Sequence, residues 1–204
     1  MDSDFEGLER WRAGDAEAGE ALFERHFPAI ARFFRNKADQ AWEDLVQRTF
    51  LACVEGRDRF GNRSTFRSYL FGIANNVLRE HYRAMRKQAS IDDAEDCSLH
   101  DLAPRASTLL AQRTEEELLL QGLRRLPFDD QLMLELRFWE QLRLREIAEV
   151  TELPEGTVSS RLRRARQKLE KAIAQLSDDE AVLRRTCTGL ETWAEGLRQR
   201  FGRP

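Results

Sequence analysis

The chain has 204 residues, of which 34% are charged and 41% are hydrophobic, a composition typical of globular proteins in water. No apolar run approaches the roughly 18 residues that a membrane-spanning helix needs, and the acidic start MDSDFE lacks the basic and apolar segments of a secretory signal. We therefore expect a cytoplasmic protein without membrane insertion, large enough for two small domains.

The net charge of −3 conceals two basic segments. Residues 63–87 contain six Lys and Arg against one acid, and residues 155–171 contain six against two. Between them, residues 89–104 carry five acids and no Lys or Arg. Two basic segments separated by an acidic one favour two contacts with a single polyanion, such as a nucleic acid.

Apolar periodicity predicts three helices in the first half of the chain, around residues 22–34, 45–54 and 66–78. Gly61 and Asn62 mark a turn before the third helix, and Ser64 or Thr65 can cap its N-terminus. No segment alternates as a strand would. We predict an all-α fold.

The acidic segment 89–113 lacks periodicity and is expected to be a flexible linker. Helical periodicity resumes at Thr114 and stops at Pro127, and Asp129 and Asp130 suit the N-terminus of a further helix. We divide the chain into domains at 1–88 and 114–176, with the linker at 89–113 and a C-terminal helical extension at 177–204.

Residues 144–166 have the pattern of a helix-turn-helix. Pro154 suits a helix start, and Val158, Leu162, Ala165, Leu169 and Ile173 form an apolar stripe that would pack the second helix. The opposite face then offers side chains suited to the DNA major groove. The alternative is a solvated basic face on an ordinary helix. The candidate DNA contacts are Glu155, Thr157, Ser160, Arg161, Arg163, Arg164 and Lys168.

Nothing in the sequence indicates catalysis. The three cysteines are far apart and the histidines do not lie beside them, so we expect no metal site. Cys53 lies on an apolar face and is expected in the core. Without a phosphate-binding glycine loop or a nucleophile motif, we expect no enzyme and no cofactor.

Three segments resemble sigma factors of the sigma-70 type. Residues 44–51 (DLVQRTFL) and 66–76 (FRSYLFGIANN) are similar to the second conserved region of that family, and residues 126–168 resemble the fourth. The likeness covers roughly residues 16–176, with only a linker between the regions, as in the compact extracytoplasmic-function (ECF) group. Tyr69 replaces the usual Trp, Asn75 the usual Arg, and Arg48 a common acid.

The resemblance implies that residues 1–88 bind core RNA polymerase and recognise and melt the minus-ten element, and that residues 114–176 bind the minus-thirty-five element. Implied partners are the β′ clamp helices and β flap of the polymerase, promoter DNA and an anti-sigma factor. Residues implied in polymerase binding are Asp44, Gln47 and Thr49; those implied at the minus-ten element are Phe60, Asn62, Arg63, Thr65, Tyr69, Arg79, Arg83 and Arg86.

Two questions stay open at this point. A helix-turn-helix regulator that binds DNA as a dimer, without replacing a sigma subunit, would also explain residues 144–168, but it gives residues 44–50 no purpose. The extension 177–204 lies outside the family pattern. Its helically spaced Leu190, Trp193, Leu197 and Phe201 favour packing on the rest of the protein over binding a regulator.

Overall fold

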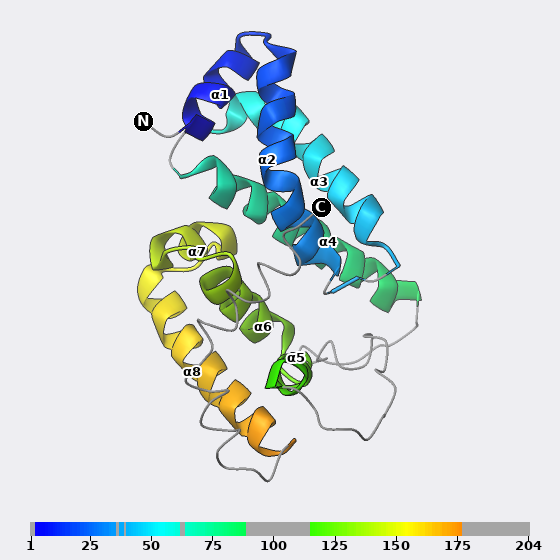
Figure 1. The fold of residues 1–204 in the computed structure, drawn as a ribbon, viewed down its shortest axis with the longest axis vertical. Coiled ribbons are helices and arrows are strands. Elements are labelled where there is room, and N and C mark those ends of the chain that lie inside the picture. The colour runs from blue at the N-terminus through cyan, green and yellow to red at the C-terminus, as the bar shows by residue number, and fades with distance from the viewer. Residues whose placement is uncertain (1–2, 36, 39, 62–63, 89–114, 177–204) are drawn as a thin grey trace. The chain divides into compact units, whose positions relative to one another are not determined.

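The computed structural model describes residues 3–35, 37–38, 40–61, 64–88 and 115–176. Every regular element within these ranges is a helix, which confirms the predicted all-α fold (Figure 1). The chain divides into two compact units, residues 1–91 with 145–153 and residues 92–144 with 154–203. The predicted linker 89–113 and extension 177–204 lie outside the described residues, and the domain bounds stay a prediction.

The first unit is built on four helices joined in sequence, namely α1 (Ser3–Arg12), α2 (Ala16–Arg35), α3 (Trp42–Gly56) and α4 (Phe66–Gln88). Helix α2 packs against α1 and α3, and α3 packs against α4. A short 3-10 turn, η1 (Arg57–Arg59), follows α3. The three predicted helices are present, whereas α1 was not predicted.

Large apolar side chains from these helices form the core of the first unit. Leu22 and Phe34 of α2, Leu45 of α3, and Leu70 and Leu78 of α4 are each exposed by no more than 2%. Apolar periodicity within residues 22–34 also includes Phe27, but this side chain is 45% exposed, so the expectation of a buried apolar face on α2 is only partly correct. His26 is buried in its place, with its Nε2 2.8 Å from a carboxylate oxygen of Asp4.

The second unit contains α5 (Glu115–Arg124), α6 (Phe128–Leu134), the π-helical turn η3 (Glu135–Trp139) and α8 (Glu155–Ala174). Helix α8 packs against α5 and α6. Its predicted apolar stripe is confirmed, since Val158, Ala165, Leu169 and Ile173 are buried and Leu162 is partly buried. Pro127 ends the preceding helical pattern as predicted, and α6 begins directly after it.

A tight turn joins α7 (Leu144–Thr151) to α8. Glu152 adopts a left-handed backbone with φ of 56°, and the N–H of Leu153 donates to the carbonyl of Ala148 at 3.1 Å. This is the hydrogen bond of a Schellman helix end. Pro154 then precedes the first residue of α8, as predicted, and its carbonyl accepts from the N–H groups of Thr157 and Val158.

We predict that Glu152→Gly raises the urea midpoint of unfolding. A side chain in the left-handed region costs about 1 kcal/mol, which glycine avoids because it has no Cβ. The matched control is Gln167→Gly, at an exposed position inside α8, where glycine is expected to cost about 1 kcal/mol. A midpoint lowered equally by both substitutions would contradict the prediction.

Candidate nucleic-acid interface

The solvent-facing side of α8 carries most of the predicted upstream DNA contacts. Glu155, Ser160, Arg163 and Arg164 are exposed, whereas Thr157 and Arg161 are half-buried. The Ser160 hydroxyl donates to the carbonyl of Thr157 at 2.9 Å. Burial of the apolar stripe on the other side fixes this face toward solvent, where guanidinium and hydroxyl groups can reach a nucleic acid.

The cations of α8 differ in what surrounds them. The ammonium of Lys168 lies 2.5 Å from a carboxylate oxygen of Asp130 in α6, and Arg166 lies 3.3 Å from Glu170. Among the described residues, Arg161 and Arg163 have no carboxylate partner within ion-pair distance. No acid among the described residues therefore neutralises the positive charge of these two arginines. Lys168, by contrast, links α8 to α6 through Asp130.

The segment after α3 presents an aromatic pair. The ring of Phe60 stacks on that of Tyr69 in α4, with ring centres 4.4 Å apart and planes 27° apart. A Cβ at Gly56 would collide with the Tyr69 hydroxyl, so glycine at the end of α3 makes room for the tyrosine. Burial raises the pKa of the Tyr69 hydroxyl. Asn62 and Arg63 lie outside the described residues.

Arg12, at the end of α1, holds this aromatic segment in place. Its Nε and Nη2 donate to the carbonyl of Arg57 at 3.0 and 2.8 Å, and Nη2 also donates to the carbonyl of Phe60. Glu9 accepts from the remaining Nη1 at 2.8 Å. No sequence pattern indicates this clamp, because its acceptors are backbone carbonyls 45 and 48 residues away.

Helix α4 provides a second basic surface. Thr65 is its cap, since the N–H of Ser68 donates to the Thr65 hydroxyl at 3.1 Å; this confirms one of the two predicted caps. Arg79 is half-buried and lies 3.4 Å from the side-chain oxygen of Asn75. Arg83 is exposed, as is Arg86. Their spacing of four and three residues places these arginines on one side of the helix.

The surface of α3 corrects one predicted contact. Asp44 and Gln47 are exposed, as a binding role requires. Thr49 is fully buried, and its hydroxyl donates to the carbonyl of Leu45 at 2.8 Å. Thr49 therefore cannot present a polar group to a partner. It lies on the buried side of the amphipathic helix α3. Leu51 and Val54, 57% and 38% exposed, are surface groups that the sequence analysis missed.

Two residues of α3 have structural roles. Cys53 is fully buried, as predicted, and burial raises its pKa to about 12, which leaves the thiol protonated and unreactive. Arg48 lies 3.2 Å from Glu80 and links α3 to α4.

In the described residues, no group of His, Cys, Asp and Glu could hold a metal ion, and no helix is long and apolar enough to cross a membrane.

The two regions match known family descriptions. Residues 22–88 match the model of sigma-70 region 2, and residues 116–169 match that of sigma-70 region 4. The first match covers α3, α4 and most of α2, and the second covers α6, α7 and most of α5 and α8. Helix α1, which supplies Arg12, precedes the first match.

Named relatives share most of their length with this chain. RNA polymerase sigma factor CarQ of Myxococcus xanthus is 31% identical over 174 residues, which are 83% of this chain and 97% of CarQ. The ECF RNA polymerase sigma-E factor of Haemophilus influenzae is 28% identical over 178 residues, which are 83% of this chain and 94% of that protein.

Solved structures show the same arrangement of helices. CnrH, in complex with the cytosolic domain of CnrY, has a TM-score of 0.64 at 25% identity and covers 86% of this chain and 100% of CnrH. RpoE of Bartonella quintana, in complex with the anti-sigma factor NepR, has a TM-score of 0.60 at 21% identity and covers 76% of this chain and 96% of RpoE. With both regions present in order, the chain belongs to the ECF group of sigma-70-type RNA polymerase sigma factors.

Proposed function

We propose that the chain directs core RNA polymerase to particular promoters and helps to open them, acting in the cytoplasm and without catalysis of its own. The observation that carries this proposal is the pairing of two nucleic-acid surfaces in one chain. One is the exposed face of α8, and the other is the Phe60–Tyr69 pair beside the arginines of α4. A single-site DNA-binding protein needs only the first.

The α8 surface is suited to the duplex at the minus-thirty-five element. Residues near the start of a recognition helix reach deepest into the major groove, which assigns base contacts to Glu155, Thr157, Ser160 and Arg161. Arg163 and Arg164 are then placed for phosphates. Lys168 can contribute to phosphate binding only in competition with Asp130, which already lies beside it.

The surface beside Phe60 is suited to the minus-ten element. Unpaired bases stack on aromatic rings, and arginines follow the backbone of a single strand. Asn62 and Arg63 are the proposed base contacts, between Phe60 and the cap at Thr65. Arg79, Arg83 and Arg86 would hold the phosphates. Binding of flipped bases would offset an unpairing cost of a few kcal/mol per base, so opening needs no chemical step.

Polymerase docking is assigned to the outer surface of α3. Asp44 and Gln47 supply exposed polar groups, and Leu51 and Val54 add apolar surface that a partner can cover. Thr49 is withdrawn from the predicted contacts because it is buried. The β′ clamp helices are the proposed partner of this surface, and the β flap that of the second region. An anti-sigma factor, such as those bound by related proteins, is a further proposed partner.

The proposal predicts promoter-dependent transcription. Full-length protein added to core RNA polymerase should form a holoenzyme in size-exclusion chromatography and give run-off transcripts from a subset of genomic fragments. Asp44→Ala/Gln47→Ala should reduce holoenzyme formation, whereas Glu17→Ala, at an exposed position of α2, serves as the control. A stable homodimer bound to palindromic DNA, with no holoenzyme, would favour the dimeric regulator instead.

Arg161→Ala should weaken and relax recognition at one upstream base pair. Loss of a bidentate arginine–guanine contact is expected to cost about 1–3 kcal/mol. Arg163→Ala is the comparison, because loss of a phosphate contact weakens binding to all sequences alike and lowers the salt dependence. Equal losses on specific and scrambled upstream sequences for Arg161→Ala would refute its assignment to a base.

Arg12→Ala should impair strand opening more than initial binding to the duplex. Removing the guanidinium leaves the carbonyls of Arg57 and Phe60 without these donors, so the segment that leads to Asn62 loses its fixed position. Permanganate reactivity of the melted region should fall, as it should for Asn62→Ala. Arg10→Ala, which removes only an ion pair with Asp15 in the turn before α2, should leave both steps intact.

A further inference from the structure

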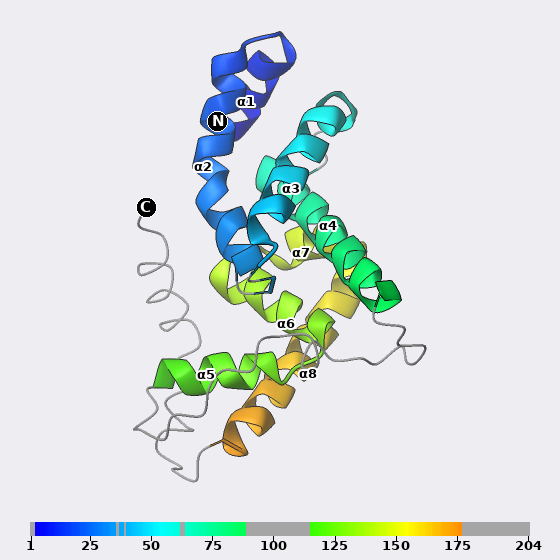
Figure 2. The same cartoon turned by 90° about the vertical axis from the view of Figure 1, so that its right-hand side faces the viewer.

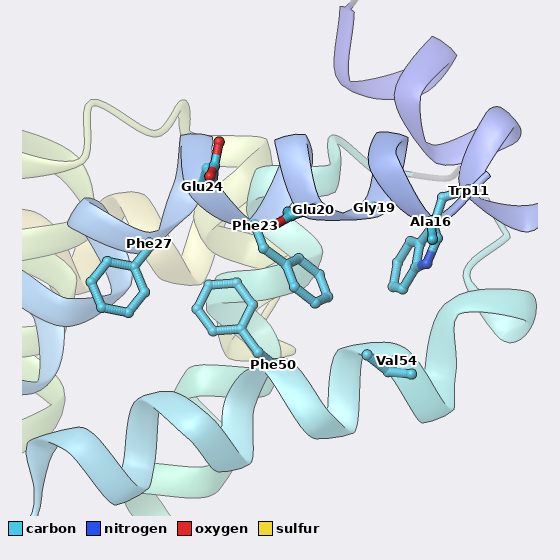
Figure 3. A pocket seen from close by; sticks show the side chains of 9 residues that line it. All are labelled: Trp11, Ala16, Gly19, Glu20, Phe23, Glu24, Phe27, Phe50 and Val54. Atoms are coloured by element: carbon cyan, nitrogen blue, oxygen red, sulfur yellow. The ribbon is translucent and has the colours of Figure 1, made fainter.

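An apolar groove runs along the first unit between α2 and α3, with α1 closing one end. It encloses about 490 Å³. Its floor is aromatic, as Figure 3 shows: the rings of Phe23 and Phe50 lie with centres 4.7 Å apart, and Trp11 meets Phe23 edge-on at 5.2 Å. Gly19 opens the end nearest Trp11, where a Cβ would lie 2.5 Å from the indole.

The groove leaves apolar surface uncovered. Phe27 and Val54, which line it on opposite helices, are 45% and 38% exposed. Contiguous apolar surface of this kind marks a binding site more often than isolated exposed side chains do. Glu20 and Glu24 also line the groove and are exposed. An occupant should therefore present large apolar side chains flanked by positive charge.

The C-terminal extension of the same chain has this chemistry. Leu190, Trp193, Leu197 and Phe201 recur at intervals of three, four and four residues, which places them on one face of a helix. Arg200 would flank that face on one side, and Arg198 on the other, where Glu191 and Glu195 also lie. The extension also lies beyond the end of the region 4 match at residue 169.

The lengths of groove and segment agree. Ala16 and Phe27, at the two ends of the groove on α2, are separated by about 17 Å of helix axis at 1.5 Å per residue. Leu190 and Phe201 would be separated by the same about 17 Å in a helix. The intervening residues 177–189 can extend over roughly 45 Å, so their length does not restrict the segment to the end of α8.

We propose that residues 190–201 bind in this groove as an amphipathic helix, with Trp193 and Leu197 against Phe23, Phe27 and Phe50. Arg200, on the flank without acids, would then pair with Glu20 and Glu24. Binding of an amphipathic helix in an apolar groove is a common mode of peptide recognition. This contact does not depend on the proposed transcription function.

A second step does rest on the proposed function. Phe50 and Val54 belong to the helix that carries Asp44 and Gln47, the proposed polymerase contacts. A bound extension would cover part of that helix and compete with core polymerase. Deletion of residues 177–204 should then increase the affinity for core polymerase, which holoenzyme titration measures separately from the contact itself.

The contact can be tested in the full-length chain with a photo-reactive benzoylphenylalanine in place of Phe27. Irradiation should join position 27 to a peptide within residues 186–204, without any change from monomer mass. Trp193→Ala/Leu197→Ala should lower the yield by about tenfold or more, because burial of two large apolar side chains dominates the binding. Thr192→Ala/Gln199→Ala, on the opposite face, is the control and should leave the yield unchanged.

A charge exchange tests the pairing. Glu20→Lys/Glu24→Lys should lower the cross-link yield, and Arg200→Glu in the same chain should restore it in part. Far-ultraviolet circular dichroism of each variant confirms that the helices are intact. Cross-links to other parts of the chain, or cross-linked dimers in which a second copy supplies the peptide, would overturn the proposal, as would a yield that the Trp193→Ala/Leu197→Ala variant leaves unchanged.

Discussion

The burial of one apolar stripe on each long helix determines which side chains can reach a nucleic acid. In α8, Val158, Ala165, Leu169 and Ile173 are buried within the second unit, and the helical repeat then turns Ser160, Arg163 and Arg164 toward solvent. Helix α4 follows the same rule with Leu70, Ala74 and Leu78. The basic surfaces therefore follow from the packing of the core.

Positive charge on these helices serves two purposes that the sequence alone does not separate. Arg48 and Lys168 lie beside Glu80 and Asp130 and link neighbouring helices. Arg161 and Arg163 have no such partner among the described residues. A count of basic residues treats all four alike, since the acids that pair with the first two are 32 and 38 positions away. Only the folded arrangement shows which charges have an acidic partner among the described residues.

The sequence predicted what depends on local periodicity and missed what depends on distant contacts. The helices around residues 22–34, 45–54 and 66–78, the cap at Thr65 and the start of α8 after Pro154 follow from short-range patterns, and all are present. Thr49 was misjudged because a polar side chain can satisfy itself on the preceding turn of its own helix. The Arg12 clamp was missed because backbone acceptors carry no sequence signal.

The side chains of helix α3 lie in three different surroundings: the core, the solvent and the apolar groove. Leu45 and Cys53 face the core, Asp44 and Gln47 face solvent, and Phe50 and Val54 line the apolar groove between these two sides. Uncovered aromatic surface favours association with other proteins. A contact that covers the groove until a partner binds would prevent such association. A segment of the same chain can do this with weak contacts, because tethering gives it a high effective concentration. A larger surface on another protein can then displace it.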